Sequence, residues 1–263
     1  MNTPVEFKAL FLGDLVGLPG YRACLEKLPS LIEIHRPQLI VVNAENAAAD
    51  GLGLLPEQFV ALGAVGVHVV TTGNHVWEKQ EILGVLASED RLLRPDNYPV
   101  SLPGKGWCLV TGEGWKAVVI NLQGRSRLAL IDDPFTRGRQ LVDRFSVETP
   151  LIFVDFHAEA PDEKEAFGYW LDGKVTAVVG THTHVATSDE RILPQGTAFQ
   201  SDLGMCGPLG SVIGGDPEVS VQRALTMLPL RSTILDAPGV VRGALVTADP
   251  RTGRAISIVR IEA

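Results

Sequence analysis

Short apolar runs, each followed by glycine or polar residues, recur along the chain. Such runs are typical of strands that are buried on both faces, because every side chain of such a strand meets other parts of the protein. β-Branched residues are frequent in them, which favours strands over helices. We expect strands at residues 7–12, 39–42, 67–70, 107–110, 116–122, 151–154 and 174–179.

Helical spacing of apolar residues lies between these runs. The segment 21–34 repeats leucine and isoleucine at helical intervals after an expected turn at 17–20, and Pro37 should end this helix. Further helices are expected at 56–63, 136–144 and 162–171. The strand–helix–strand–helix–strand order at the start of the chain predicts a parallel sheet covered by helices.

The remaining runs predict antiparallel pairing. A hairpin is expected around Gly112-Glu113-Gly114. Strand-like runs in the C-terminal part predict a second, more antiparallel sheet, and they lie at 232–235, 243–247 and 255–261. No repeat, low-complexity segment or clear linker divides the sequence, so we expect a single domain over residues 1–263.

Composition narrows the class of protein. The chain has 263 residues, of which 45% are hydrophobic and 21% charged, enough to bury a sizeable core. Its net charge of -8 disfavours a stable complex with nucleic acid, although a small anionic substrate remains compatible. Three widely spaced cysteines without a CxxC motif favour a reducing compartment. Neither a signal peptide nor a membrane span is expected, so we predict a cytoplasmic protein.

Side chains with metal-binding atoms follow five of the predicted strands. They are Asp14, Glu45, Asn46, Asn74, His75, His157, His182 and His184. The carboxyl ends of parallel strands lie along one edge of a sheet, where we expect these side chains to converge. If the backbone stays extended beyond Gly180, the two histidines at i and i+2 point to the same side.

The donor set indicates which metals such a site would hold. Imidazole with carboxylate and amide oxygen, without thiolate, suits iron, manganese or zinc. Seven ligands are too many for one ion and fit two ions bridged by a shared carboxylate, for which Glu45 is the natural candidate. Two ions roughly 3.5–4 Å apart would share a hydroxide and hold the oxygens of a phosphate. His75 diverges from Asn74 and is better placed as a general acid.

Each of these residues also has a structural explanation. A single histidine or aspartate at a strand end is often structural, and asparagines such as Asn43, Asn46 and Asn74 are common in turns. For His35 and His68 we expect structural roles. The other four of the six histidines all follow predicted strands, and this shared position favours a metal site over four separate structural roles.

The ordered blocks resemble those of the calcineurin-like metallophosphoesterases. The corresponding blocks here are Gly13-Asp14, Glu45-Asn46, Gly73-Asn74-His75, His157 and Gly180-Thr181-His182-Thr183-His184. Two blocks depart from the usual pattern of that superfamily. Val16 stands where the first block usually has histidine, and Glu45-Asn46 replaces the usual aspartates of the second.

This variant is similar to the bacterial 2',3'-cyclic-nucleotide 2'-phosphodiesterase branch. Three further stretches, 94–99, 121–125 and 202–208, extend the resemblance over nearly the whole chain. The resemblance implies an α/β fold in which a two-sheet β-sandwich is flanked by helices, the four-layer αββα fold. It also implies a dinuclear iron- or manganese-type centre and the hydrolysis of phosphodiesters.

The resemblance also implies a role for each residue. Asp14, Glu45, Asn46 and His184 would hold the first ion, and Glu45, Asn74, His157 and His182 would hold the second. His75 would be the acid. Asn97, Arg125 and the loop 204–207 are further candidates for shaping the substrate pocket.

We therefore expect a metal-dependent phosphodiesterase acting on small phosphodiesters, with 2',3'-cyclic nucleotides as the first candidate. A metal-bridging hydroxide would attack, and His75 would protonate the leaving oxygen. The expected cofactors are two divalent or trivalent ions per chain, iron or manganese, with zinc also compatible. Three alternatives stay open: a phosphomonoesterase on the same dinuclear site, a regulatory metal-binding protein with little catalysis, and a metal-independent α/β binding domain. We expect no membrane association, and a homo-oligomer is compatible with free strand edges.

Overall fold

Two β-sheets form the centre of the protein, in a computed structural model that describes residues 6–263. In the first sheet, β1, β3 and β4 are parallel, whereas β13 pairs antiparallel with β1 and β14 with β13. Its order is β14 (Ala255–Glu262), β13 (Arg242–Ala248), β1 (Phe7–Leu12), β3 (Leu39–Asn43) and β4 (Val69–Thr71).

The second sheet contains the middle of the chain. Four of its strands are parallel and its two outer strands, β5 and β9, are antiparallel to their neighbours. Its order is β5 (Trp107–Gly112), β6 (Trp115–Gln123), β7 (Ile152–His157), β8 (Ala177–Thr181), β10 (Ala198–Gln200) and β9 (Arg191–Ile192). A small third sheet is ordered β12 (Gly239–Val240), β11 (Met205–Pro208) and β2 (Asp14–Leu15).

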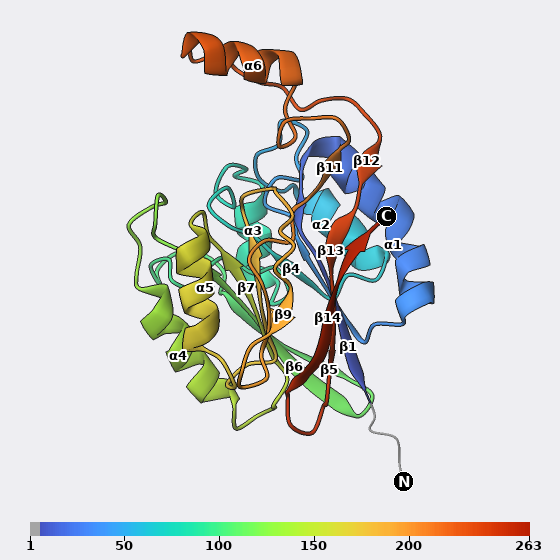
Figure 1. The fold of residues 1–263 in the computed structure, drawn as a ribbon, viewed down its shortest axis with the longest axis vertical. Coiled ribbons are helices and arrows are strands. Elements are labelled where there is room, and N and C mark those ends of the chain that lie inside the picture. Colours follow the sequence, from blue (N-terminus) through green and yellow to red (C-terminus); the bar gives the residue numbers. More distant parts are fainter. Residues whose placement is uncertain (1–5) are drawn as a thin grey trace.

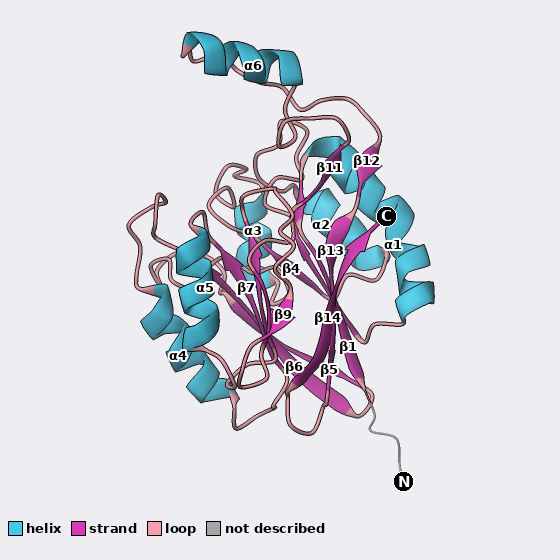
Figure 2. Cartoon of the chain, viewed as in Figure 1, coloured by secondary structure: helices cyan, strands magenta, loops and turns pink. Residues whose placement is uncertain are grey.

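Helices cover the outer face of each sheet (Figures 1 and 2). On the first sheet they are α1 (Gly17–His35), α2 (Pro56–Ala64) and α3 (Ile82–Ser88); on the second they are α4 (Pro134–Phe145) and α5 (Pro161–Trp170). The two sheets share an apolar core that contains Phe7, Phe11 and Phe153. The predicted four-layer α/β sandwich is therefore confirmed.

The expected turn at 17–20 is wrong, because α1 already begins at Gly17. Proline fits the first turn of a helix, where its missing N–H has no partner to lose. Pro19 therefore does not delay the helix. At the other end α1 stops at His35, and Arg36 adopts the left-handed conformation that commonly closes a helix.

The expected separate C-terminal sheet is also wrong. Strand β13 pairs with β1 from Phe7–Ala248 to Leu12–Gly243, so the C-terminal strands extend the first sheet. The segment 232–235 forms no strand and makes one isolated bridge, between Gly215 and Ile234. Two helices were not expected: α3 and α6 (Pro217–Thr226). None of the residues of α6 is buried, so its sequence carries no stripe of core-facing apolar residues.

Within residues 6–263, every helix is too short or too polar to cross a membrane.

Candidate metal centre

The strands of both sheets bring the candidate ligands together. Asp14, Glu45, Asn46 and Asn74 follow strands of the first sheet, whereas His157, His182 and His184 end or follow strands of the second. The expectation of one edge of a single sheet is therefore wrong. The ligands meet because the two sheets pack face to face with their parallel strands ending at the same end of the sandwich.

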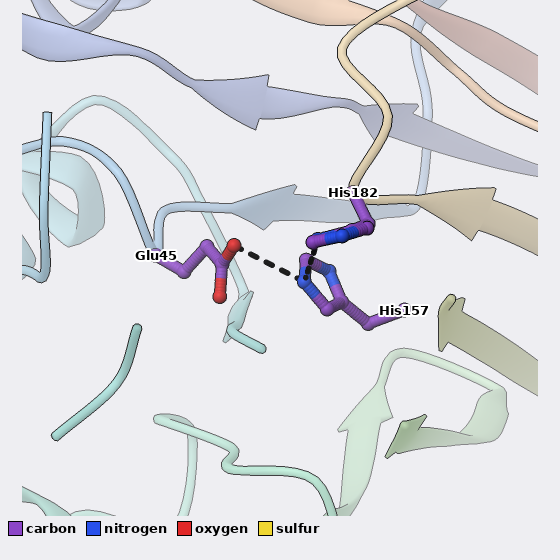
Figure 3. A group of neighbouring side chains, drawn as sticks. All are labelled: Glu45, His157 and His182. Carbon is purple, nitrogen blue, oxygen red and sulfur yellow. Dashed lines mark hydrogen bonds and ion pairs between the residues drawn. The ribbon is translucent and has the colours of Figure 1, made fainter. Parts of the chain in front are cut away.

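His157 is the centre of this cluster (Figure 3). Its side chain is fully buried, and three atoms that can accept hydrogen bonds surround its Nε2. Glu45 Oε1 lies 3.1 Å away, Asn74 Oδ1 3.1 Å and His182 Nδ1 3.0 Å. A single N–H cannot satisfy three acceptors, whereas one cation coordinated by all four atoms would. Ligand atoms of Glu45, His157 and His182 lie within 4.8 Å of one another.

A chain of hydrogen bonds fixes which nitrogen of His157 faces the cluster. The Thr181 hydroxyl donates to Asp155 Oδ1 at 2.7 Å, and it lies 3.0 Å from His157 Nδ1. Because the only hydroxyl proton is already used, Nδ1 must donate to Thr181. In the neutral ring Nε2 then carries the lone pair, as a metal ligand requires.

Asp155 joins the two sheets directly behind the cluster. It lies in β7, and its Oδ2 accepts hydrogen bonds from Asn43 of β3 and Thr71 of β4. Its Oδ1 accepts from Thr181 of β8. Four strands therefore meet on one carboxylate that is 2% exposed. Asp155 was not among the predicted site residues, although an aspartate inside a buried apolar strand is a signal that it has a polar partner.

The remaining candidates form a second group beside the first. His184 Nε2 lies 3.3 Å from Asn46 Oδ1, and the Asn46 amide donates to Gly51 O at 2.8 Å, which aims its carbonyl at the histidine. Asp14 is fully buried, and its Oδ1 has no hydrogen-bond partner among the described residues. An unpaired buried carboxylate oxygen is costly, and a bound cation would satisfy it.

The loop that carries His182 and His184 is not extended, so the expected same-side arrangement is wrong. The φ angles are 101° at His182 and 64° at His184, a region that residues other than glycine rarely adopt. His182 therefore reaches the group around His157, whereas His184 reaches Asn46.

A buried ion pair stabilises this loop. Asp202 Oδ2 accepts from the backbone N–H and the hydroxyl of Thr183, at 3.0 and 2.8 Å, and from Lys164 Nζ at 2.7 Å. Both charged side chains are at most 2% exposed. Asp202 lies in the stretch 202–208 that carries part of the family resemblance, but neither Asp202 nor Lys164 was among the predicted site residues.

The electrostatics of the cluster favour a cation. Burial raises the pKa of Asp14 to about 6. Burial would also raise the pKa of Glu45, but the positive charge of His157 outweighs it and lowers that pKa to about 2. Conversely, burial would lower the pKa of His157, but Glu45 and Asp14 raise it to about 9. Burial and the charge on His157 lower the pKa of His182 to about 3. Without a metal, the cluster therefore holds a proton at His157 Nε2.

The residues fit metal binding. The donors are nitrogen and oxygen, and two buried carboxylate oxygens of the cluster, Asp14 Oδ1 and Glu45 Oε1, have no hydrogen-bond partner among the described residues. A Cβ at Gly73 would lie 2.2 Å from His157 Nε2 and 2.4 Å from Glu45 Oε2. The glycine of the third block is thus required because Glu45 and His157 approach its backbone closely.

His75 lies beside the ligands instead of among them. Its backbone N–H donates to Glu45 Oε2 at 3.0 Å, and its Nδ1 lies 3.5 Å from Glu78 Oε1. The imidazole lines a pocket that also contains Asn46 and His184. This position is compatible with the predicted role as an acid.

Two of the three candidates for the substrate pocket have other contacts. The Asn97 amide donates to the backbone oxygens of Gln123 and Asp132, and Arg125 pairs with Asp133 in an exposed position. The third, the segment 204–207, was expected to be a loop but forms most of strand β11. It contacts the loop of His182 and His184 through Met205, whose N–H donates to His184 O at 3.2 Å.

The fold and the cluster together define a metallophosphoesterase of the calcineurin-like type, as the resemblance implied. A family model described as "YmdB-like protein" matches residues 10–261, and the chain belongs to this family. The chain is 43% identical over 254 residues to the 2',3'-cyclic-nucleotide 2'-phosphodiesterase of Bacillus subtilis (strain 168), an alignment that covers 97% of this chain and 96% of that protein.

Two solved structures are closely similar. The crystal structure of a novel phosphatase from Mycoplasma pneumoniae has a TM-score of 0.92 and 33% sequence identity, over 99% of this chain and 94% of that chain. A hypothetical protein from Thermus thermophilus has a TM-score of 0.88 and 36% identity, over 98% and 99% of the two chains. The predicted family and fold class are therefore confirmed.

We predict that Thr181→Val weakens metal binding about 10- to 100-fold, since His157 loses the acceptor that fixes its tautomer. Calorimetric titration of the metal-free protein with Mn²⁺ measures the change in affinity. Thr197→Val is the matched control, because Thr197 is also buried and donates to Val175 O, two residues before β8 begins and away from the cluster. Equal affinities in the two variants would contradict the proposed role of Thr181.

We also predict that metal binding at neutral pH releases a proton from His157. The pKa of His157 is raised to about 9, so its Nε2 is protonated at pH 7 and must lose that proton to bind a metal. Apparent affinity should fall about tenfold for each pH unit below this pKa. Calorimetry in buffers of different ionisation enthalpy counts the released protons. Binding without proton release at pH 7 would exclude His157 as a ligand.

Proposed function

We propose that the protein is a metal-dependent phosphodiesterase that hydrolyses small phosphodiesters, with 2',3'-cyclic nucleotides as substrates. The single observation that carries this proposal is the convergence of Glu45 Oε1, Asn74 Oδ1 and His182 Nδ1 on His157 Nε2. The similarity to the 2',3'-cyclic-nucleotide 2'-phosphodiesterase of Bacillus subtilis supports the choice of substrate. The net charge of -8 favours a small substrate over a long polyanion.

The two groups of residues divide the proposed ligands between two ions. Asp14, Asn46 and His184 would hold the first ion, Asn74, His157 and His182 the second, and Glu45 both. Metal ions bound there would neutralise the charge on the phosphoryl oxygens and supply a nucleophile at neutral pH. Nitrogen and oxygen donors without sulfur are compatible with iron or manganese and also with zinc.

In this proposal the protein's own side chains hold the bound cations and supply the proton that the leaving oxygen needs. The fully buried Asp14 and Glu45 hold negative charge where water is excluded, so they favour bound cations strongly. His75 borders the pocket and protonates the leaving oxygen as the P–O bond breaks. Glu78 faces its Nδ1, which leaves the Nε2 edge for the substrate.

A second candidate, a phosphomonoesterase on the same site, is favoured by the similarity to the Mycoplasma pneumoniae phosphatase structure. Three substrates distinguish the two activities. Turnover of 2',3'-cyclic AMP supports the phosphodiesterase. Turnover of p-nitrophenyl phosphate supports the phosphomonoesterase if neither 2',3'-cyclic AMP nor bis-p-nitrophenyl phosphate is hydrolysed.

We predict that Asn74→Ala lowers both metal content and hydrolysis of 2',3'-cyclic AMP, because it removes one of the atoms that surround His157 Nε2. Elemental analysis should give about two ions per wild-type chain and fewer in the variant. A metal content near zero in the wild type, after growth and purification with Fe and Mn, would refute the dinuclear centre.

His75→Ala should act differently, keeping the metal content and lowering kcat about 10²- to 10⁴-fold, the range for loss of a general acid. His35→Ala is the control, because His35 lies in the last turn of α1, before β3 begins, whereas the candidate ligands Glu45 and Asn46 follow the other end of that strand. Activity that is indifferent to His75→Ala would favour the regulatory alternative.

A further inference from the structure

A pocket of about 770 Å³ lies directly beside the candidate metal centre. Asn46, His75 and His184 form part of its lining, so the pocket is continuous with the site proposed for the phosphate. Its volume lies within the usual range for sites that enclose small molecules. A phosphate group alone would fill only a small part of it.

The opposite wall comes from the segment 211–234, which contains α6 (Figure 1). This wall is mainly apolar, with Ile213, Leu228 and Ile234 among its residues, and Ser220 and Arg223 add hydrogen-bond donors. Apolar lining with a few polar groups is typical of pockets that bind ring systems. Val16, at the position where the superfamily usually has a histidine ligand, also belongs to the lining and makes its floor apolar.

Two contacts attach this wall to the metal centre. His184 Nδ1 donates to Ile213 O at 3.2 Å, which leaves its Nε2 facing Asn46. Ile234 packs so closely on the first residue of α1 and on the loop after β3 that a Cβ at Gly17 would lie 2.5 Å, and one at Gly51 2.6 Å, from its side chain. The wall therefore has a defined position relative to the ligands.

The apolar residues of the wall are not explained by core packing. Ile213 is 56% exposed and Leu228 56% exposed, and no residue of α6 is buried. Figure 1 shows α6 extending away from the two sheets. Exposed apolar side chains that border a catalytic pocket are expected where a ligand covers them.

We propose that this wall binds the nucleoside of the substrate, with the base packed against Ile213, Leu228 and Ile234 while the phosphate lies at the metal centre. Ser220 and Arg223 contact the polar edge of the base or the ribose. This inference rests on the proposed function and deepens it, because it assigns the recognition of the nucleoside to a segment that carries none of the candidate metal ligands.

The test compares two leucines of the same segment. Leu228→Ala removes part of the wall, whereas Leu225→Ala changes a residue of α6 that is 74% exposed and does not line the pocket. For 2',3'-cyclic AMP we expect Leu228→Ala to raise KM about three- to tenfold with little change in kcat. For glycerol 1,2-cyclic phosphate, which has the same cyclic ester without a base, KM should not change. Leu225→Ala should leave both substrates unaffected.

Equal KM changes for the two esters, or no change for either, would overturn the inference. A Leu228→Ala protein with altered mass in light scattering and an unchanged KM would overturn it too, and would indicate a contact between chains.

Binding measurements distinguish failure of this inference from failure of the proposed function. If neither ester is hydrolysed by the wild type, the proposed function fails. The inference is then decided by whether Leu228→Ala weakens binding of adenosine 3'-monophosphate and leaves that of inorganic phosphate unchanged.

Discussion

The structure depends on the buried carboxylate of Asp155. It accepts hydrogen bonds from Asn43, Thr71 and Thr181, and so links strands β3, β4, β7 and β8 of the two sheets. A buried charge is tolerated only when its hydrogen bonds are satisfied, so these strands must end close together. Through Thr181 the same carboxylate sets the tautomer of His157. The protonation of the candidate metal site therefore depends on how the two sheets pack.

This linkage explains why the candidate ligands can be both buried and charged. Asp14, Glu45 and His157 are all inaccessible to water, and their pKa values are shifted by burial and by one another. A cluster with three acceptors around one nitrogen is electrostatically incomplete without a cation. The apolar core between the sheets supplies the rigidity that holds such an arrangement in place, and the Lys164–Asp202 pair does the same for the loop of His182 and His184.

The two sheets and the segment 211–234 have different roles in this arrangement. The two sheets position the groups proposed for metal binding, and their geometry leaves little freedom, as the close approach at Gly73 illustrates. The segment 211–234 contributes no buried apolar helix face to either sheet and borders the pocket instead. Rigid strands with chemistry at their ends, next to a loop segment that recognises the ligand, are a common solution in α/β proteins.

Much of the fold and of the candidate site was predictable from the sequence. Runs such as 39–42 and 151–154 determine buried parallel strands, because continuous apolar side chains require cover on both faces. The residues that follow these strands, from Asp14 to His184, could be identified because strand ends are where parallel sheets place their ligands.

Other features were decided only by tertiary structure. Strand β13 joins the first sheet because β1 has an open edge, and β14 then pairs with β13. The apolar pattern of a strand does not determine which strand it pairs with. Asp155 could not be assigned until both sheets were in place, since its partners lie on three other strands. The strand-like run at 232–235 forms no strand, because Ile234 packs on Gly17 and Gly51, which lie far away in the chain. The sequence thus determined which residues form strands and which carry chemistry; the packing of two sheets decided which of them meet, because that depends on contacts between residues far apart in the chain.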